Sequence, residues 1–362
     1  MTPSSRAPLR TALVGYGLGG AVFHAPLLAA NPDFSLEFVV TGSAERRAQA
    51  SREHPGVRLA ARLEELWEGA SAGAFDLVVI STPNRTHAPL AAAALARGAH
   101  VVVDKPLAVS VAEGRSLSAA ALAAGRLVIP FQNRRWDGDF LTVRSLLAGG
   151  SLGTVHRFES RFERWRPEPK GGWKERADPA EAGGLLYDIG SHLIDQALVL
   201  FGPARAVYAE LDRRRAGVAV DDDTYVALTH HSGVRSHLYA TVLAAQTAPR
   251  FRLLGTSAAY TKMGLDVQEA ALRAGRRPDG AGWGEEPPGA WGALGNDGEA
   301  QRIPTRHGDY PAFYAGVARA LRGEGEAPVT TGEAIATLEV IEAAKASAAE
   351  GRVVTLGDGA SG

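Results

Sequence analysis

The sequence contains no cysteine, and its charges nearly cancel, with 39 lysines and arginines against 40 aspartates and glutamates in 362 residues. Without cysteine, the chain can form no disulfide, no thiolate metal site and no cysteine nucleophile. A net charge of -1 gives no field that would attract nucleic acid or an anionic membrane surface, so we expect neither and predict a small-molecule partner. No apolar run approaches the ~20 residues of a membrane span, and the polar start of the chain shows no secretory signal pattern. These absences favour a cytoplasmic protein.

The chain is longer than one hydrophobic core usually supports, so we expect two domains, residues 1–130 and 131–362. In the first, short β-branched runs alternate with alanine-rich stretches, which predicts an α/β Rossmann domain with a doubly wound parallel sheet. The predicted strands are residues 9–14, 36–40, 77–80, 100–103 and 127–129, and the predicted helices are residues 19–30, 44–53, 88–96 and 111–124.

After Pro130 the pattern changes to a run of strands that follows a helix, which predicts an α+β domain with a large, mostly antiparallel open sheet. The predicted strands are residues 155–164, 206–211, 224–229, 234–241 and 251–254, and the predicted helices are residues 139–148, 311–321 and 331–349. A Ser232-Gly233 turn is expected to join two of the strands as a hairpin. The segment 275–298, with two tryptophans, is expected to be a long ordered loop. An uncovered apolar face of the open sheet would bind another copy, so we expect a homodimer or a higher homo-oligomer.

The segment Gly15-Tyr16-Gly17-Leu18-Gly19-Gly20 follows the first predicted strand and opens the first predicted helix. It matches the dinucleotide-binding pattern G-x-G-x-x-G, in which Gly15 allows a tight turn, Gly17 lets the backbone approach a pyrophosphate and Gly20 permits close helix packing. The start of the helix, next to Leu18, would face the negative charge. The motif predicts dinucleotide binding, and a glycine turn that serves packing alone is the alternative.

The second predicted strand ends without the acidic residue that usually binds the ribose 2′-hydroxyl of NAD. Hydroxyl groups at Thr41 and Ser43 and a guanidinium group at Arg46 or Arg47 would instead suit a 2′-phosphate. We therefore expect NADP as the preferred cofactor. NAD stays open as the second choice because Glu45 could accept the ribose hydroxyls, and the arginines could also only solvate a helix face.

Two further segments follow predicted strands at the edge where doubly wound sheets bind their ligands. Thr82, Pro83, Asn84 and His87 are expected to lie along the nicotinamide ribose, although a helix-capping turn would also explain this segment. Lys105, in Asp104-Lys105-Pro106, is expected to meet the reactive end of the cofactor, since the following proline restricts the backbone that carries it. A solvated surface lysine is the alternative.

The segment 183–195, GGLLYDIGSHLID, carries three polar side chains at helical spacing. In an α-helix, Asp188, His192 and Asp195 would lie along one face. A carboxylate one turn from an imidazole is suited to acid/base chemistry, because an unperturbed imidazole with a pKa of about 6.5 accepts and returns a proton near neutral pH. A structural histidine is the alternative, and Asp195 could either hold the imidazole or contact a neighbouring strand.

The glycine fingerprint, the Asp104-Lys105-Pro106 segment and the segment 183–195, in this order, resemble the glucose-fructose oxidoreductase/inositol dehydrogenase family (Gfo/Idh/MocA) over nearly the whole chain. The stretches GAVFHAP at 20–26 and QNRRWD at 132–137 are similar to the branch that contains NADP-dependent scyllo-inositol dehydrogenases.

The resemblance implies catalytic roles for Lys105, Asp188 and His192. In the family scheme, the substrate hydroxyl gives its proton to His192 while a hydride leaves the same carbon for the nicotinamide. Lys105 binds that oxygen, and Asp188 orients the substrate and Lys105. Asp104 stands where the family has glutamate, and its shorter side chain puts the cofactor-side contact of this position in doubt.

Other side chains could border a substrate. Asn133, Arg134 and Trp136 follow the last predicted strand of the first domain, although interdomain ion pairs would equally explain the arginine. Trp173 and Tyr187 could stack on a sugar-like ring, although burial in the core is the simpler account.

The sequence thus predicts an NADP-dependent dehydrogenase that acts on a secondary hydroxyl, or the corresponding ketone, of a cyclitol, polyol or sugar. We expect no metal, because the acidic run at 221–223 lacks the ligand spacing of a calcium loop and the histidine pair at 230–231 lacks a third ligand. A sugar or aldose dehydrogenase of another branch stays open. So does a regulator that binds the dinucleotide without turnover.

Overall fold

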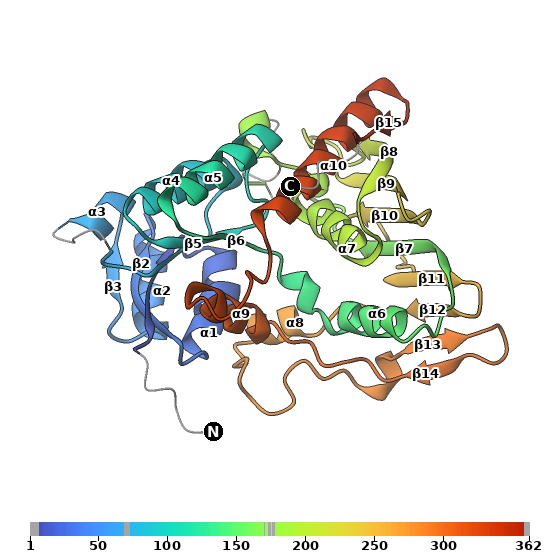
Figure 1. Ribbon diagram of the computed structural model, residues 1–362, viewed down its shortest axis with the longest axis horizontal. Coiled ribbons are helices and arrows are strands. Elements are labelled where there is room, and N and C mark those ends of the chain that lie inside the picture. The colour runs from blue at the N-terminus through green and yellow to red at the C-terminus, as the bar shows by residue number, and fades with distance from the viewer. Residues whose placement is uncertain (1–6, 69–72, 170, 173–174, 176–177, 358–362) are drawn as a thin grey trace.

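The computed structural model describes residues 7–68, 73–169, 171–172, 175 and 178–357 (Figure 1). Within these residues, six parallel strands form a first sheet in the order β3-β2-β1-β4-β5-β6. The strands are β1 (Leu9–Val14), β2 (Phe34–Val40), β3 (Arg58–Ala60), β4 (Leu77–Ile80), β5 (His100–Asp104) and β6 (Val128–Phe131). The order reverses between β1 and β4, which makes this a doubly wound sheet and confirms the predicted Rossmann fold.

The inner strands form where the sequence is apolar on both faces. β4 is buried at every position because helices cover both sides of the sheet. These helices are α1 (Ala25–Ala29), α2 (Ala44–Glu53), α3 (Leu63–Trp67), α4 (His87–Ala96) and α5 (Val111–Ala124). α2 and α5 begin where predicted, and the hydroxyls of Ser43 and Ser110 cap them by accepting hydrogen bonds from backbone N–H groups.

A second sheet follows in the same described ranges, with nine strands in the order β14-β13-β12-β11-β7-β10-β9-β8-β15. Only β7 and β10 pair in parallel there, so the predicted mostly antiparallel sheet is confirmed. Its strands are β7 (Val155–Glu163), β8 (Ala204–Asp212), β9 (Asp223–His230), β10 (Arg235–Thr241), β11 (Phe251–Gly255), β12 (Ala259–Lys262), β13 (Gly292–Gly295), β14 (Gln301–Ile303) and β15 (Val354–Thr355). β9 and β10 form the predicted hairpin, and its turn glycine, Gly233, has a φ of +89°.

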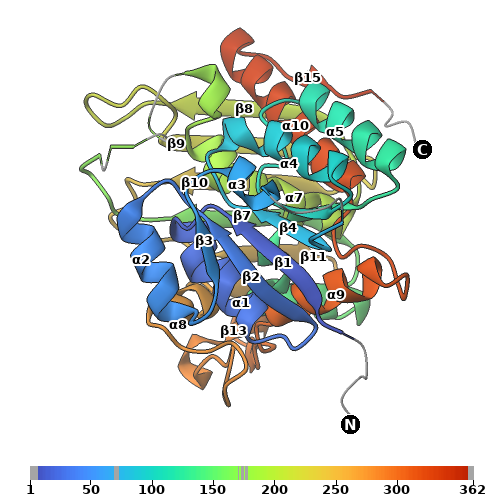
Figure 2. The same ribbon diagram turned by 90° about the vertical axis from the view of Figure 1, so that its left-hand side faces the viewer.

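Helices α6 (Gly138–Ala148), α7 (Ser191–Phe201), α8 (Gln268–Arg273), α9 (Pro311–Leu321) and α10 (Thr331–Glu350) complete the described chain. α7 and α10 contact the second sheet, and α10 also lies beside α5 of the first lobe (Figure 2). α9 returns fully to the first lobe, where Phe313, Tyr314 and Val317 join the core that contains Leu13 and Phe131. The two C-terminal helices therefore tie the lobes together. No helix of the described residues has the length and apolarity to cross a membrane.

The outward face of the second sheet differs from the expected apolar surface. Along β7, buried side chains alternate with half-buried Glu159 and Arg161, and Tyr239 on β10 lies beside them. The guanidinium of Arg161 lies 4.4 Å from the centroid of the Tyr239 ring. The period of two that buries one face thus leaves charged and aromatic groups on the other. The expectation of an apolar outer face was wrong along β7 and β10, where the outward groups are charged and aromatic.

Further elements differ from the prediction. The predicted helix at residues 19–30 is a π-helix over Gly19–His24 followed by α1, and α3, α8, β12 and β14 were not predicted. β3 was missed because its three residues carry too short an apolar pattern, and β13 lies inside the segment expected to be a loop. That segment is ordered by contacts such as the hydrogen bond from Trp283 Nε1 to Gln268 Oε1 at 3.0 Å.

Candidate active site

A cleft of about 680 Å³ begins at the carboxyl ends of β1 and β4 and extends to α7 of the second lobe. This is the switch point at which doubly wound sheets bind ligands. Most of the residues singled out in the sequence line it: Gly15, Gly17, Leu18, Thr41, Arg46, Thr82, Pro83, Asn84, Asp104, Lys105, Asn133, Arg134, Asp188 and His192.

The glycine turn at the mouth of the cleft leaves no room for side chains. Gly15 has a φ of +98°, and a Cβ there would lie 2.0 Å from the carbonyl oxygen of Ser81. A Cβ on Gly20 would lie 2.0 Å from the carbonyl oxygen of Gly15. Gly20 does not line the cleft, and its part is to let the following helix pack against the turn, as the fingerprint predicts.

The end of β2 presents cationic groups to the same mouth. The closest atom to a Cβ built on Gly17 is Nη1 of Arg46, at 3.6 Å, and Arg62 also lines the cleft. Arg47 is held differently, because its Nη1 donates to the carbonyl oxygen of Thr41 at 2.6 Å. Ser43 does not line the cleft, since its hydroxyl caps α2 by accepting from the N–H of Arg46 at 3.3 Å. Arg46 and Arg62 are therefore the cations that could meet a 2′-phosphate.

Two side-chain hydrogen bonds hold the turn after β4 in place. The hydroxyl of Thr86 donates to the carbonyl oxygen of Pro83 at 2.6 Å, and Asn84 Nδ2 donates to the carbonyl oxygen of Ala182 at 3.1 Å. Thr86 precedes α4 but makes no side-chain cap hydrogen bond to it, so the capping alternative does not hold for this residue, and Asn84 bridges the two lobes beside the cleft.

His87 lies behind this turn, fully buried, and does not line the cleft. Its Nδ1 is 2.8 Å from the carbonyl oxygen of Pro106, and its Nε2 is 2.9 Å from that of Thr82. Burial lowers the pKa of His87, against the opposing charge of Asp104. The imidazole thus connects the Thr82 turn to the turn that carries Lys105, whose peptide bond to Pro106 is cis.

Asp104 lies beneath the glycine turn. Its Oδ1 accepts a hydrogen bond from the N–H of Lys105 at 2.9 Å, and its Oδ2 accepts one from the Ser81 hydroxyl at 3.1 Å. A Cβ on Gly19 would lie 2.6 Å from that Oδ2. Burial alone would raise the pKa of Asp104, but the opposing contributions of His24, followed by His87 and Lys105, leave it well below its usual range. Asp104 is therefore a fixed negative charge at the floor of the cleft.

Lys105 and Asp188 meet from opposite lobes. Lys105 Nζ lies 3.0 Å from Asp188 Oδ1 and also donates to the backbone carbonyl oxygen of Asp188. The lysine side chain is 14% exposed and the aspartate 30%, so the pair faces the cleft without lying free in solvent. The predicted meeting of a first-lobe ammonium with the Asp188 segment is present.

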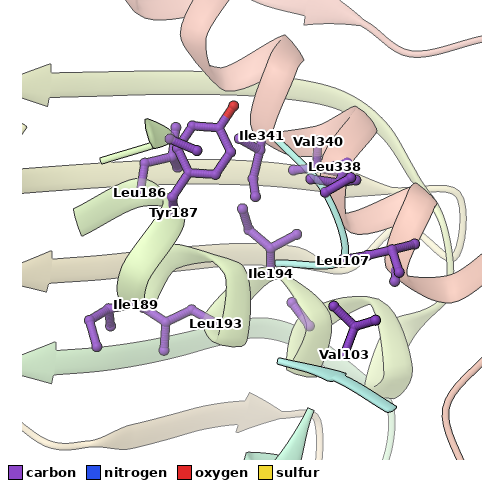
Figure 3. Packing of buried hydrophobic residues seen from close by; sticks show 14 of the residues in the cluster. Val103, Leu107, Leu186, Tyr187, Ile189, Leu193, Ile194, Leu338, Val340 and Ile341 are labelled. Carbon is purple, nitrogen blue, oxygen red and sulfur yellow. The ribbon is translucent and has the colours of Figure 1, made fainter. Parts of the chain in front are cut away.

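The Asp188 segment is not the α-helix that the spacing suggested. Leu186–Gly190 forms a π-helix, and α7 begins only at Ser191. Its apolar side chains, Leu186, Tyr187 and Ile189, pack in a cluster with Ile341 of α10 (Figure 3). The wider turn changes the facing of the three predicted polar residues, and each has a different partner.

His192, at the start of α7, is buried with 5% of its surface exposed. Its Nδ1 lies 3.0 Å from Oε1 of Gln132. Gln132 belongs to the QNRRWD stretch at 132–137 but was not predicted as a site residue. Because an amide oxygen only accepts, the neutral imidazole carries its proton on Nδ1 and keeps a lone pair on Nε2.

Asp195 does not hold the imidazole. It forms a two-point ion pair with Arg135, at 2.7 and 2.8 Å, and burial raises the pKa of Asp195.

Two of the aromatic candidates, Tyr187 and Trp136, fall outside the cleft. Tyr187 donates from its hydroxyl to the carbonyl oxygen of Val109 at 3.1 Å, and Trp136 packs edge-on against Phe313 at 5.5 Å between ring centroids. Neither side chain lines the cleft. For Tyr187, this agrees with the alternative of burial in the core. Trp173 lies outside the described residues.

A charged wall that the sequence did not reveal closes the far end of the cleft. Arg134, Arg164 and Arg273 surround Glu269, with nitrogen-to-oxygen distances of 2.7, 3.9 and 2.8 Å respectively. Burial raises the pKa of Glu269, but the arginines outweigh it and lower the pKa to about 2. These residues come from three separate places in the chain, because Glu269 and Arg273 share α8, so only their i, i+4 spacing was visible in advance.

The residues fit a dinucleotide at one end and proton transfer at the other. The glycine turn and two arginines suit phosphate groups, and an ammonium, a carboxylate and an imidazole with a defined tautomer meet where the lobes join. In the described part of the chain, no three His, Asp or Glu side chains gather as a metal site would require.

Comparisons with known proteins agree with this geometry. Residues 9–131 match the model of the oxidoreductase family with an NAD-binding Rossmann fold, and residues 140–261 match the GFO/IDH/MocA C-terminal domain. The oxidoreductase YdgJ of Escherichia coli (strain K12) is 40% identical over 92% of this chain and 94% of its own length. The scyllo-inositol 2-dehydrogenase (NADP(+)) IolW of Bacillus subtilis (strain 168) is 35% identical over 96% of both chains.

Among solved structures, the oxidoreductase yvaA from Bacillus subtilis is similar with a TM-score of 0.90 and 34% identity, over 96% of this chain and 98% of that one. The sequence resemblance is thereby confirmed at the level of the family. The chain belongs to the GFO/IDH/MocA family of oxidoreductases and carries that family's NAD-binding Rossmann fold.

Proposed function

We propose that the protein transfers a hydride between NADP(H) and a secondary hydroxyl, or the corresponding ketone, of a cyclitol, polyol or sugar. The observation that carries the proposal is the contact between Lys105 of the first lobe and Asp188 of the second, in one cleft with the glycine turn and His192. The likeness to IolW, named as a scyllo-inositol 2-dehydrogenase, supports a cyclitol as the first substrate to test.

The chemistry divides between cofactor and chain. When bound, the nicotinamide ring supplies the hydride acceptor or donor. The ammonium of Lys105 donates a hydrogen bond to the reacting oxygen and stabilises negative charge on it, while Asp188 holds the ammonium in place. His192 takes the hydroxyl proton at Nε2 during oxidation and returns it during reduction, with Gln132 fixing the tautomer.

The preference for NADP rests on the end of β2. Arg46 and Arg62 line the cleft there, and no aspartate ends the strand to repel a 2′-phosphate. Glu45 leaves NAD as the second cofactor. Comparing kcat/KM for NADP+ and NAD+ at saturating substrate tests the preference, and a strong preference for NAD+ contradicts it.

Two alternatives differ in what they do with the same cleft. A dehydrogenase of another branch would turn over an aldose rather than a cyclitol, and a regulator would bind the dinucleotide without turnover. The joint presence of the lysine, the aspartate and the imidazole favours an enzyme. The test is a panel of inositols and sugars with NADP+ and NAD+, read at the absorbance of the reduced nicotinamide. Dinucleotide binding with no turnover of any member would support the regulator.

Three further expectations stay proposals. The division at residues 130/131 into a cofactor domain and a substrate domain explains why Lys105 and Asp188 come from opposite lobes. A homodimer, or a higher homo-oligomer, would form through the charged and aromatic outer face of the second sheet, which light scattering can test. The cytoplasmic location stays a prediction from the sequence.

A further inference from the structure

A second cavity opens beside the catalytic groups. It has a volume of about 290 Å³, and four residues line both it and the main cleft: Arg164, Gly184, Asp188 and Ile189. Small-molecule sites typically measure about 300–1,000 Å³, so the side cavity has room for a substituent of a substrate held at Asp188.

Arg164 marks the junction of the two spaces. Its guanidinium lies over the Phe162 ring, 4.6 Å from the centroid, and its side chain is 26% exposed. Its one ion partner in the described chain is Glu269, at 3.9 Å, beyond hydrogen-bond distance, and within the same residues its guanidinium donates no hydrogen bond. Stacking uses the face of a guanidinium and leaves its N–H edge for an anion.

Within the part of the chain that the structure describes, no carboxylate lies within hydrogen-bond distance of the Arg164 guanidinium. Glu269, its distant partner, is already bound by Arg134 at 2.7 Å and Arg273 at 2.8 Å. Burial lowers the pKa of Arg164, and the nearby charges of Arg166 and Arg134 lower it as well, against Glu269 and Asp188. A guanidinium stays protonated under such conditions, so Arg164 is a cation that a negatively charged group on a ligand would stabilise.

Arg215 and Asp221, two other charged groups of the side cavity, have partners of their own. Arg215 pairs with Asp222 at 2.9 Å and with Glu175 at 3.1 Å. Asp221 accepts hydrogen bonds from the N–H of Leu186 and from a threonine hydroxyl, at 2.7 and 2.8 Å. Arg166, exposed at the cavity wall, adds a second cation.

We propose that the substrate carries an anionic group, a carboxylate or a phosphate, which enters the side cavity and is bound by the N–H edge of Arg164. This rests on the proposed function and narrows its substrate class from neutral polyols to acidic ones. The reacting hydroxyl lies at Lys105 and His192, and the anionic group lies on the far side of Asp188. Arg164 is thus a specificity-determining residue.

The experiment compares acidic and neutral substrates on the full protein with saturating NADP+. D-gluconate and D-glucuronate carry a carboxylate, D-glucose 6-phosphate carries a phosphate, and D-glucose and myo-inositol are neutral. We expect higher kcat/KM for one acidic class, which identifies the carboxylate or the phosphate. We expect Arg164→Gln to lower the ratio of acidic to neutral kcat/KM about 10²-fold, mainly through KM, the usual effect of removing one partner of a desolvated charge pair.

Two controls separate the explanations. Arg164→Lys keeps the charge but not the two-point edge, so it should recover part of the ratio. Arg144→Gln, at an exposed position on α6, should behave as the parent. The affinity for NADPH, from fluorescence titration, should be the same in the Arg164 variants. A loss of NADPH affinity in Arg164→Gln would instead assign the arginine to the cofactor and overturn the proposal.

If the protein prefers neutral substrates and Arg164→Gln does not change the ratio of acidic to neutral kcat/KM, the inference is wrong while the proposed function stands. If no substrate is turned over, the proposed function fails, and calorimetric titration of the NADPH-loaded protein with D-glucuronate and D-glucose 6-phosphate decides the inference alone. Binding of either acid that is lost in Arg164→Gln supports it, and no binding of either contradicts it.

Discussion

Replacing His192 with alanine tests the assignment of the proton acceptor directly. A general acid/base group contributes about 10²- to 10⁴-fold to the rate, so kcat for the best substrate of the panel should fall by that factor. The imidazole is buried and its Nδ1 contacts Gln132, so its removal also leaves the amide oxygen without that donor. An unsatisfied buried polar group costs about 1–3 kcal/mol of stability, which the protein must tolerate for the rate to be interpretable.

The assay therefore has three readouts on each variant: kcat and kcat/KM against pH, the Kd for NADPH, and the midpoint of thermal unfolding. His192→Ala should keep its NADPH affinity and lose the pH-dependent limb of kcat/KM that reports the base. Gln132→Leu keeps the imidazole but not its fixed tautomer, so its loss of rate should be smaller than that of His192→Ala. His156→Ala, at an exposed position on β7, is the matched control.

Two outcomes would contradict the assignment of His192 as the proton acceptor. If His192→Ala turns over within about threefold of the parent, with the same pH profile, the imidazole does not exchange the substrate proton. A loss of rate that accompanies a loss of NADPH affinity, or an unfolded protein, would assign His192 a structural part instead.

Three further predictions follow from single contacts. Arg46→Ala should raise KM for NADP+ about 10-fold and leave KM for NAD+ nearly unchanged, because a charged hydrogen bond to a phosphate is lost; equal effects on both cofactors would contradict the NADP assignment. Gly20→Ala should abolish NADPH binding measured by fluorescence, since the new Cβ would lie 2.0 Å from the carbonyl oxygen of Gly15 and the turn must open. The pKa of Glu269 is lowered from 4.5 to about 2 in the folded protein, so its contribution of about 3 kcal/mol is present above pH 4.5 and is lost as the pH falls toward 2. Urea unfolding at several pH values should show that Glu269→Gln flattens this acid limb, and an unchanged limb would contradict the shift.

Periodic patterns in the sequence predicted the regular elements well. α2, α5 and α9 have the predicted bounds, because each begins at a capping residue or a proline. β3 and the strands β12 to β14 were missed or only partly anticipated, because strands of three or four residues carry too few side chains to show a period of two. The same reasoning could not distinguish the π-helix at Leu186–Gly190 from an α-helix, since both bury apolar residues every three to five positions.

The sequence predicted the site residues that lie in motifs, but not the charged residues that line the rest of the cleft. The position of Lys105 after a predicted strand, the helical spacing of Asp188 and His192 and the family resemblance singled these three residues out from the sequence. Arg164 and Glu269 are ordinary charged residues on a strand end and a short helix, and their meeting depends on the sheet order. Gln132 lay in a quoted stretch, and a polar residue directly after β6 at the ligand edge was the available signal for it.

The way the lobes are joined bears on how the site works. The hydroxyl of Tyr314 on α9 lies 2.7 Å from Nδ1 of His24, whose other nitrogen faces Asp104 at 3.9 Å, directly behind Lys105. A C-terminal helix thus reaches under the glycine turn and contacts the segment that carries the ammonium. Effective catalysis requires the reacting groups to be held within a fraction of an ångström, and buried contacts of this kind hold Lys105 at its distance from Asp188. We therefore expect Tyr314→Phe, which removes only the hydroxyl, to lower kcat more than it lowers NADPH affinity. An unchanged kcat would show that the lobe contact does not set the position of Lys105.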